Sequence, residues 1–229
     1  MMKIAVVVGS LRKNSYNKKL ARALEKLAMG KMSFTYVDIA SLPLFNQDLE
    51  ADLPPAVMKL KADIESADGV LFVTPEYNRS IPGVLKNAID WASRPYGQSS
   101  WAGRPAAICG TSPGAIGTAV AQMHLRSIAS GFLDMPVLGQ PEIYITYKDE
   151  YFDADQNVVN DATRKFLQGF LDKFASWVAL HAAACRCAPR YSRLRRNISQ
   201  GSARLYRHTT EPRFYKRRRI CGFFCLWPA

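Results

Sequence analysis

Apolar runs that are too short for helices recur along the first 180 residues. Residues 4–8, 69–74 and 105–110 are almost continuously apolar, which is typical of strands buried on both faces of a parallel sheet. Residues 33–37 alternate between polar and apolar side chains and indicate an edge strand. Residues 143–145 predict a fifth strand. The sequence therefore predicts a five-stranded sheet.

Between these strands, apolar residues recur at the three- and four-residue spacing of amphipathic helices. The expected helices cover residues 18–27, 56–67, 84–92, 118–130 and 161–183. A strand–helix unit repeated five times favours a doubly wound α/β fold, a parallel sheet with helices on both faces. Right-handed crossovers then favour the strand order 2-1-3-4-5. Ligands of such sheets bind beyond the carboxyl ends of the strands, where the strand order reverses.

Three polar loops, residues 9–17, 75–78 and 111–117, follow apolar strands and should meet at that edge. The first leads into a helix, whose N-terminus presents free N–H groups and the positive end of the helix dipole. Such a site suits a phosphate. The loop contains a single glycine, so it is neither a P-loop nor a dinucleotide fingerprint.

Side chains must therefore complete the phosphate site. Ser10, Ser15 and Asn17 can donate hydrogen bonds, and Arg12 can bind two phosphate oxygens at once. The alternative interpretation is that Ser15 only caps the helix, while Arg12 and Lys13 are surface charges.

The other two loops combine proline, glycine and one aromatic residue, Tyr77, and could form a shelf for a planar ring. The first 181 residues contain no apparent serine–histidine–acid set, no metal-ligand spacing and no paired carboxylates near these loops. A phosphate socket beside a ring shelf, with few acid–base groups, suggests that a bound cofactor carries the reaction. FMN, with one phosphate and one ring, fits this description. Cys109 and Trp101 are interpreted as core residues, with a redox thiol and the edge of a substrate cleft as the alternatives.

The net charge of +12 is concentrated at one end of the chain. Residues 182–229 contain 12 Arg or Lys and one acid, whereas residues 1–181 contain 19 basic and 18 acidic residues. We therefore expect one domain over residues 1–181, followed by a basic tail that is disordered or a non-native extension. The tail could bind polyanions non-specifically. The cysteine content and the absence of a signal peptide or a long apolar run favour the cytoplasm, without membrane contact.

The quoted residues allow a resemblance to be stated. Gly9-Ser10-Leu11-Arg12 with Ser15 and Asn17, then residues 75–78, 82–83 and 86–91, resemble the NAD(P)H-dependent FMN reductase family. The resemblance is strongest to its chromate or quinone reductases and azoreductases, and it covers about residues 3–180. It implies a flavodoxin-like fold, bound FMN, and a homodimer or homotetramer in which the helix 84–92 forms part of the dimer contact.

The resemblance also implies a reaction and a set of cofactor contacts. NADH or NADPH would reduce the flavin by a ping-pong mechanism, before a quinone, azo compound, free flavin or metal oxyanion such as chromate is reduced. No catalytic side chain and no metal site are implied. The implied FMN-binding residues are Ser10, Arg12, Ser15, Tyr16, Asn17, Pro75, Glu76, Tyr77, Asn78, Ser112 and Gly114.

Some questions stay open at this level. The chain departs from chromate-reductase-like relatives at Val120 and Met123, where these carry an Arg and a Tyr that contribute to contacts between dimers. No residue is clearly placed to recognise a ribose 2′ substituent, so the sequence does not choose between NADH and NADPH. A flavodoxin-like electron carrier without NAD(P)H turnover is the alternative function.

Overall fold

A five-stranded parallel sheet forms the centre of residues 1–187, the part of the chain that the computed structural model describes. Its strand order is β2-β1-β3-β4-β5, as the sequence predicts. The strands are β1 (Met2–Val8), β2 (Met32–Tyr36), β3 (Gly69–Val73), β4 (Ala106–Ser112) and β5 (Ile143–Thr146). The strands β2 and β3 lie on opposite sides of β1. The direction in which strands are added to the sheet therefore reverses after β2, while all strands stay parallel.

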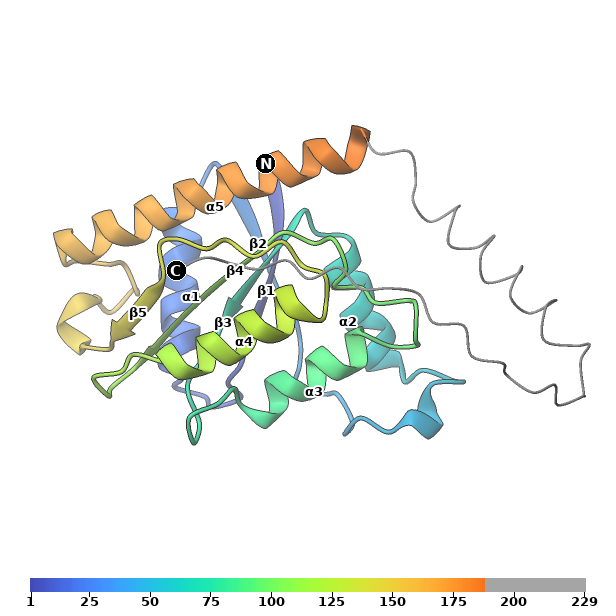
Figure 1. Cartoon of the computed structure of the whole chain (residues 1–229). Coiled ribbons are helices and arrows are strands. Elements are labelled where there is room, and N and C mark those ends of the chain that lie inside the picture. Colours follow the sequence, from blue (N-terminus) through green and yellow to red (C-terminus); the bar gives the residue numbers. More distant parts are fainter. Residues whose placement is uncertain (188–229) are drawn as a thin grey trace, which may run out of the picture. The chain divides into compact units, whose positions relative to one another are not determined.

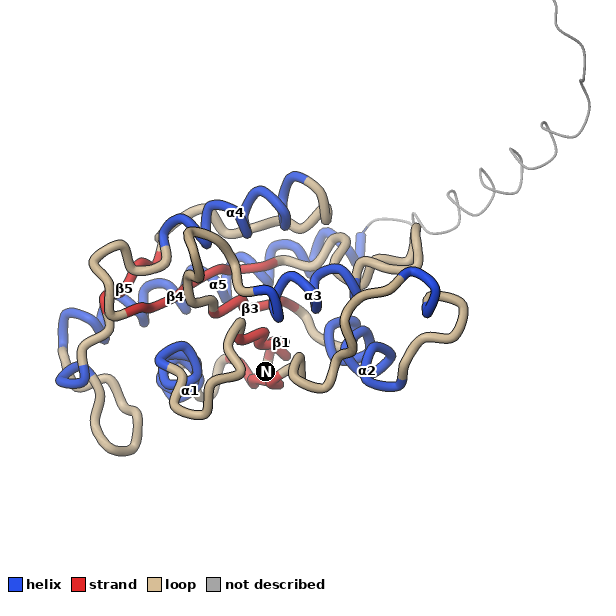
Figure 2. Tube along the Cα trace, turned by 90° about the horizontal axis from the view of Figure 1, so that it is seen from below, coloured by secondary structure: helices blue, strands red, loops and turns tan. Residues whose placement is uncertain are grey.

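Helices cover both faces of the sheet (Figure 1). Two of them, α1 (Tyr16–Leu27) and α5 (Asp161–Cys187), pack on one face. The other face is covered by α2 (Pro55–Glu65), α3 (Gly83–Ala92) and α4 (Ala119–Gly131). Figure 2 shows the sheet between these two groups of helices. Short 3₁₀ helices at Gln47–Leu49 and Asp149–Tyr151 lie in the connections.

The alternation of side chains along the strands separates the two cores. In β1, Ile4 and Val6 face the core below α1 and α5, whereas Ala5 and Val7 face the core below α2, α3 and α4. All four are completely buried. The continuous apolar run of this strand therefore reflects burial on both faces.

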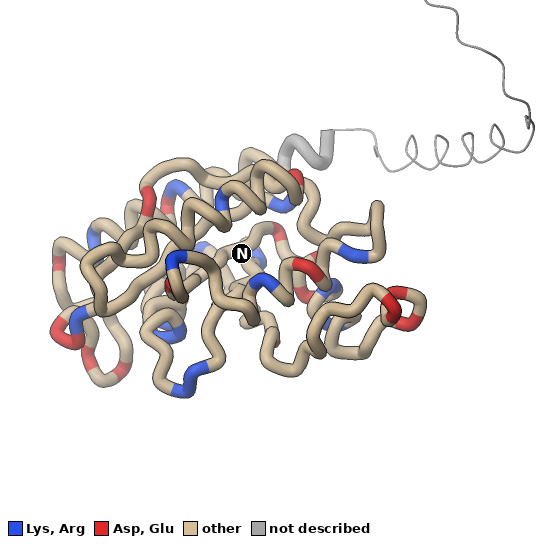
Figure 3. The backbone as a smooth tube through the Cα atoms, turned by 60° about the horizontal axis from the view of Figure 1, so that its bottom comes forward, with Lys and Arg blue, Asp and Glu red and all other residues tan. Residues whose placement is uncertain are grey.

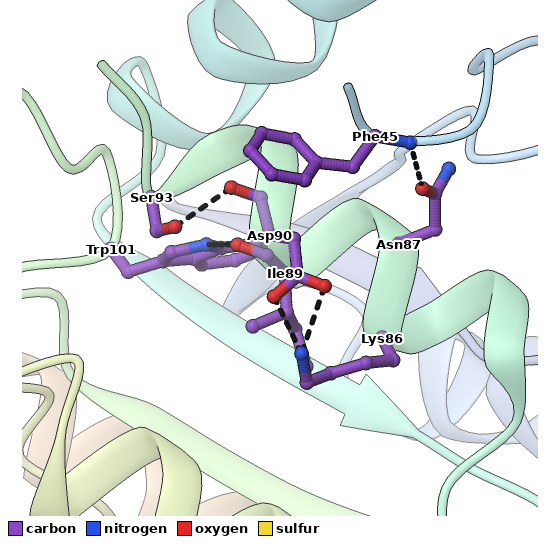
Figure 4. Close-up of polar contacts among 7 residues, drawn as sticks. All are labelled: Phe45, Lys86, Asn87, Ile89, Asp90, Ser93 and Trp101. Carbon is purple, nitrogen blue, oxygen red and sulfur yellow. Dashed lines mark hydrogen bonds and ion pairs between the residues drawn. The ribbon is translucent and has the colours of Figure 1, made fainter. Parts of the chain in front are cut away.

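The helix α3 holds a neighbouring loop through Asn87 (Figure 4). Its side-chain amide accepts a hydrogen bond from the Phe45 N–H (2.8 Å) and donates one to the Pro43 carbonyl (2.9 Å). Trp101 is fully buried under the same helix, and its Nε1 donates to the Ile89 carbonyl at 3.0 Å. Trp101 is thus a core residue, and the alternative of a cleft edge is wrong.

The last helix, α5, continues beyond residue 181 to Cys187. The predicted boundary at 181 therefore falls inside a helix, and the rest of the basic tail lies outside the described residues. Within those residues, no helix is both long and apolar enough to cross a membrane. Charges of both signs are interspersed over the described part of the chain (Figure 3).

The surroundings of Gly110 in β4 leave no room for a side chain. A substitution at this position should therefore lower the stability of the fold. A methyl group there would overlap the Thr74 carbonyl oxygen and the Thr118 hydroxyl. Gly110→Ala should therefore lower the free energy of unfolding by about 1–3 kcal/mol in urea denaturation. Gly169, exposed in α5 with open space around it, is the matched control. Gly169→Ala should raise stability by about 0.5–1 kcal/mol. Equal effects of the two substitutions would contradict this packing analysis.

Candidate functional site

The loop between β1 and α1 leaves the sheet in a tight turn. The Gly9 N–H donates to the Val73 carbonyl (2.9 Å), and the Ser10 N–H donates to the Val8 carbonyl (2.8 Å). Ser15 is the N-cap of α1, and its Oγ accepts a hydrogen bond from the Lys18 N–H at 3.3 Å. The capping interpretation of Ser15 is therefore confirmed. It does not exclude phosphate binding, because the Ser15 hydroxyl can still donate its own hydrogen.

The predicted site residues line two adjoining cavities at the carboxyl ends of β1, β3 and β4. The smaller cavity, of about 150 Å³, is lined by nine of the eleven: Ser10, Arg12, Ser15, Tyr16, Asn17, Pro75, Glu76, Tyr77 and Ser112. The larger one, of about 640 Å³, is lined by the other two, Asn78 and Gly114, and again by Glu76 and Ser112. The structure thus brings together residues from three separate loops.

Several donors at the smaller cavity have no partner within residues 1–187. The Ser10 side chain is only 4% exposed, yet its hydroxyl makes no hydrogen bond there. The Arg12 guanidinium forms no ion pair in this part of the chain and lies 4.9 Å from the centre of the Tyr16 ring. The N–H groups of Tyr16 and Asn17, in the first turn of α1, have no acceptor within the helix. The smaller cavity therefore presents several hydrogen-bond donors to an anion.

The Asn17 side chain also has a structural role, which does not test the predicted one. Its Nδ2 donates to the Thr111 carbonyl (2.9 Å), and its Oδ1 accepts from the Thr111 N–H (3.0 Å). The buried amide thus joins the start of α1 to the end of β4. Asn17 can contribute to anion binding through its backbone N–H.

Glu76 also has a structural role that the sequence did not reveal. Its Oε2 accepts hydrogen bonds from the N–H groups of Val120 (3.0 Å) and Ala121 (3.1 Å), in the first turn of α4. Its Oε1 pairs with Arg79 at 2.9 Å. The formal N-cap of α4, Thr118, makes no side-chain capping bond. The carboxylate of Glu76, from another loop, therefore caps α4. Its negative charge also interacts favourably with the positive end of the helix dipole.

Residues 77–80 form a tight turn beside the larger cavity. The Tyr77 and Ser80 backbones exchange two hydrogen bonds of 3.0 Å each, and Asn78 and Arg79 both have positive φ angles, 51° and 62°. The Ser80 hydroxyl contacts His124 Nδ1 at 3.1 Å, so His124 helps hold the turn from the surface of α4. Tyr77, half exposed, is presented at the mouth of the site.

An aromatic cluster packs against Tyr16, at the end of the loop between β1 and α1. The Tyr16 ring lies 4.1 Å from that of Tyr147, which stacks on Phe152 at 5.4 Å. Lys19 Nζ donates to the Tyr147 hydroxyl at 3.1 Å, and this hydrogen bond raises the pKa of Lys19. Tyr147 and Phe152 are more than 120 residues from Tyr16 and carry no recognisable local pattern, so sequence reasoning missed them.

The site offers little acid–base chemistry of its own. Cys109 is completely buried in β4, and burial raises the pKa of its thiol, so it is a core residue and not a redox thiol. Among residues 1–187, Glu76 is the one carboxylate that lines the cavities, and it is held by α4 and Arg79. No group of three or more metal-ligating side chains occurs among the described residues. The arrangement can bind an anion and orient a ring, which are the requirements of FMN.

Comparison with known proteins identifies relatives over most of the chain. The profile of the NADPH-dependent FMN reductase family matches residues 2–150. A 2-hydroxy-1,4-benzoquinone reductase of Burkholderia sp. is 58% identical over 177 residues, which are 77% of this chain and 96% of that protein. A quinone reductase of Pseudomonas putida is 55% identical over 181 residues, 79% of this chain and 96% of that protein.

A solved structure agrees with these relatives. The flavoenzyme NAD(P)H:(acceptor) oxidoreductase FerB of Paracoccus denitrificans is 51% identical, with a TM-score of 0.77. The match covers 79% of this chain and 99% of that one. This similarity confirms the flavodoxin-like architecture that the sequence predicts.

The capping role of Glu76 predicts a difference between two substitutions. Glu76→Ala removes both hydrogen bonds to α4 and should lower the free energy of unfolding by about 1–2 kcal/mol. Glu76→Gln keeps an oxygen acceptor and should cost less. Urea denaturation of the two variants measures the difference. If Glu76→Ala were as stable as the unchanged protein, the carboxylate would not act as the cap.

Proposed function

The chain belongs to the NADPH-dependent FMN reductase family and is an FMN-dependent NAD(P)H oxidoreductase, and from this premise we propose that its electron acceptors are quinones. The names of the relatives in Burkholderia and Pseudomonas support quinones as the acceptor class. Reduction of azo compounds, free flavin or chromate stays a prediction from the resemblance.

The observation that supports this function best is the set of uncommitted donors at the start of α1. The Ser10 hydroxyl, the Arg12 guanidinium and the N–H groups of Tyr16 and Asn17 would bind the phosphate of FMN. Glu76, the one carboxylate that lines this cavity within residues 1–187, is already held by α4 and Arg79 and does not oppose them.

The ring would extend from the smaller cavity into the larger one. Pro75 and Tyr77 in the smaller cavity, Asn78 and Gly114 in the larger one, and Ser112 in both would line the flavin. When bound, FMN supplies a ring that accepts a hydride from NAD(P)H and passes electrons to the acceptor. The fixed turn at residues 77–80 would keep the ring in one orientation, while the openness of the larger cavity leaves room for the two substrates in turn.

We further propose that the chain acts in the cytoplasm as a homodimer or homotetramer. Two large apolar side chains of α4 and its C-terminal cap, Met123 and Phe132, are 63% and 82% exposed. Exposed apolar groups of this size favour contact with another subunit. The domain over residues 1–181 is supported by the extent of the relatives, which cover 77–79% of this chain.

The proposed activity predicts a yellow protein that contains nearly stoichiometric FMN. It should oxidise NADPH or NADH steadily when a benzoquinone is present, with the parallel double-reciprocal lines of a ping-pong mechanism. Stopped-flow and steady-state absorbance measure both half-reactions. A flavin that is reduced once, but not turned over with quinone, would identify an electron carrier and contradict the proposal.

The phosphate role of Arg12 can be tested by FMN titration. Arg12→Ala should weaken FMN binding by about 1.5–3 kcal/mol, the contribution of a hydrogen bond to a charged group. Flavin fluorescence quenching in the apoprotein measures the affinity. Lys59→Ala is a matched control, because Lys59 lies on α2 and pairs with Asp63 at 2.7 Å. Unchanged FMN affinity in Arg12→Ala would remove this residue from the phosphate site.

A further inference from the structure

The larger cavity of the candidate site is lined by a cation, Arg79, that the proposed FMN contacts do not use. Within residues 1–187, Glu76 and Arg79 are the only charged side chains that line this cavity of about 640 Å³. The resemblance assigns Glu76 to FMN and gives Arg79 no role. The proposed FMN contacts therefore leave Arg79 available to a second ligand of the larger cavity.

The acid beside Arg79 is compensated by other groups as well. Glu76 Oε1 accepts a hydrogen bond from Arg79 Nη1 at 2.9 Å, and Glu76 Oε2 accepts two from N–H groups at the start of α4. The side chain of Glu76 is 8% exposed, whereas that of Arg79 is 65% exposed. A guanidinium has five N–H donors, and among the described residues only Nη1 of Arg79 has an acceptor. Arg79 can therefore bind an anion while Glu76 keeps it in place.

The backbone of Arg79 is fixed at the edge of the larger cavity. It lies in the turn that the Tyr77 and Ser80 backbones close with two hydrogen bonds of 3.0 Å each. His124 on α4 contacts the Ser80 hydroxyl at 3.1 Å and holds the same turn. Because both the backbone and one edge of the guanidinium are already held, little conformational entropy is lost when Arg79 binds a ligand.

The loop after β4 supplies neutral surface to the same cavity. Ala115 and Ile116 contribute apolar groups, and Ile116 is 44% exposed. The backbone N–H groups of Gly114, Ala115 and Ile116 have no acceptor in the part of the chain that the structure describes. A carbonyl oxygen on a small ring can accept a hydrogen bond from such a group. The larger cavity thus combines a cation with apolar surface and neutral donors, which suits a flat ring that carries a negative charge.

We propose that Arg79 selects acceptor quinones that carry an ionised hydroxyl group on the ring. The inference rests on the proposed function, because it assumes that FMN in this site reduces quinones. Such a hydroxyl group is acidic, since its anion shares the charge with a carbonyl group of the ring. The ionised oxygen and the adjacent carbonyl oxygen lie side by side, so a guanidinium can bind both, as it binds the two oxygens of a carboxylate. Arg79 transfers no proton or electron and acts on specificity alone.

Binding can be measured without turnover, because oxidised flavin does not reduce a quinone. The ionised 2-hydroxy-1,4-naphthoquinone and the neutral 2-methyl-1,4-naphthoquinone are titrated by calorimetry into the oxidised, FMN-loaded full chain. Arg79→Gln should weaken binding of the hydroxyl compound by about tenfold and that of the methyl compound by less than about twofold. Arg79→Lys keeps the charge but loses the planar fork, so its affinity for the hydroxyl compound should lie between the two.

A matched control is available on α5. Arg164 is also about half exposed and also pairs with an acid three residues earlier, Asp161. Arg164→Gln therefore removes the same charge and the same kind of ion pair at a position away from the cavity. It should change neither affinity.

Steady-state kinetics provide a second measurement. The ratio of kcat/KM for the hydroxyl compound to that for the methyl compound should fall by about tenfold in Arg79→Gln. Comparing this ratio between variants removes the difference in reduction potential between the two quinones. Unchanged affinities and an unchanged ratio in Arg79→Gln would overturn the inference, and so would loss of FMN from this variant, which would assign Arg79 to the cofactor. If the unsubstituted protein reduced neither quinone, the proposed function itself would fail.

Discussion

The reversal of strand order between β2 and β3 is the constraint on which the site depends. It leaves the N-terminus of α1 at a crevice in the edge of the sheet, where the N–H groups of Tyr16 and Asn17 have no acceptor within residues 1–187. The bidentate contact between Asn17 and Thr111 then joins this helix start to the end of β4. Because both partners are buried, the loops on either side of the crevice are held in one arrangement.

Polar groups around the crevice divide into those that are already paired and those that are not. Asn17, Glu76 and Arg79 fix the loops through bonds to backbone or to each other. The side chains of Ser10 and Arg12 have no hydrogen-bonding partner within residues 1–187, and both line the smaller cavity. Preorganised donors of this kind bind a dianion without first breaking protein contacts. The redox chemistry itself belongs to the cofactor.

Much of this arrangement could be predicted from sequence, because strand and helix periodicities are local. The apolar run at Ile4–Val8 identified a central strand, and the order of polar loops identified the crevice. What could not be predicted were contacts between distant segments. The cap that Glu76 provides to α4 and the stack of Tyr147 on Tyr16 each require the folded chain. The structural contact of the Asn17 amide could not be predicted either, because its partner, Thr111, is 94 residues away.

The most direct measurement is a crystal structure of the chain with bound FMN. The account predicts that the phosphate oxygens lie within hydrogen-bond distance of the Ser10 hydroxyl, the Arg12 guanidinium and the N–H groups of Tyr16 and Asn17, with the ring over residues 75–78. A phosphate bound elsewhere, with the start of α1 making no contact to it, would contradict the account.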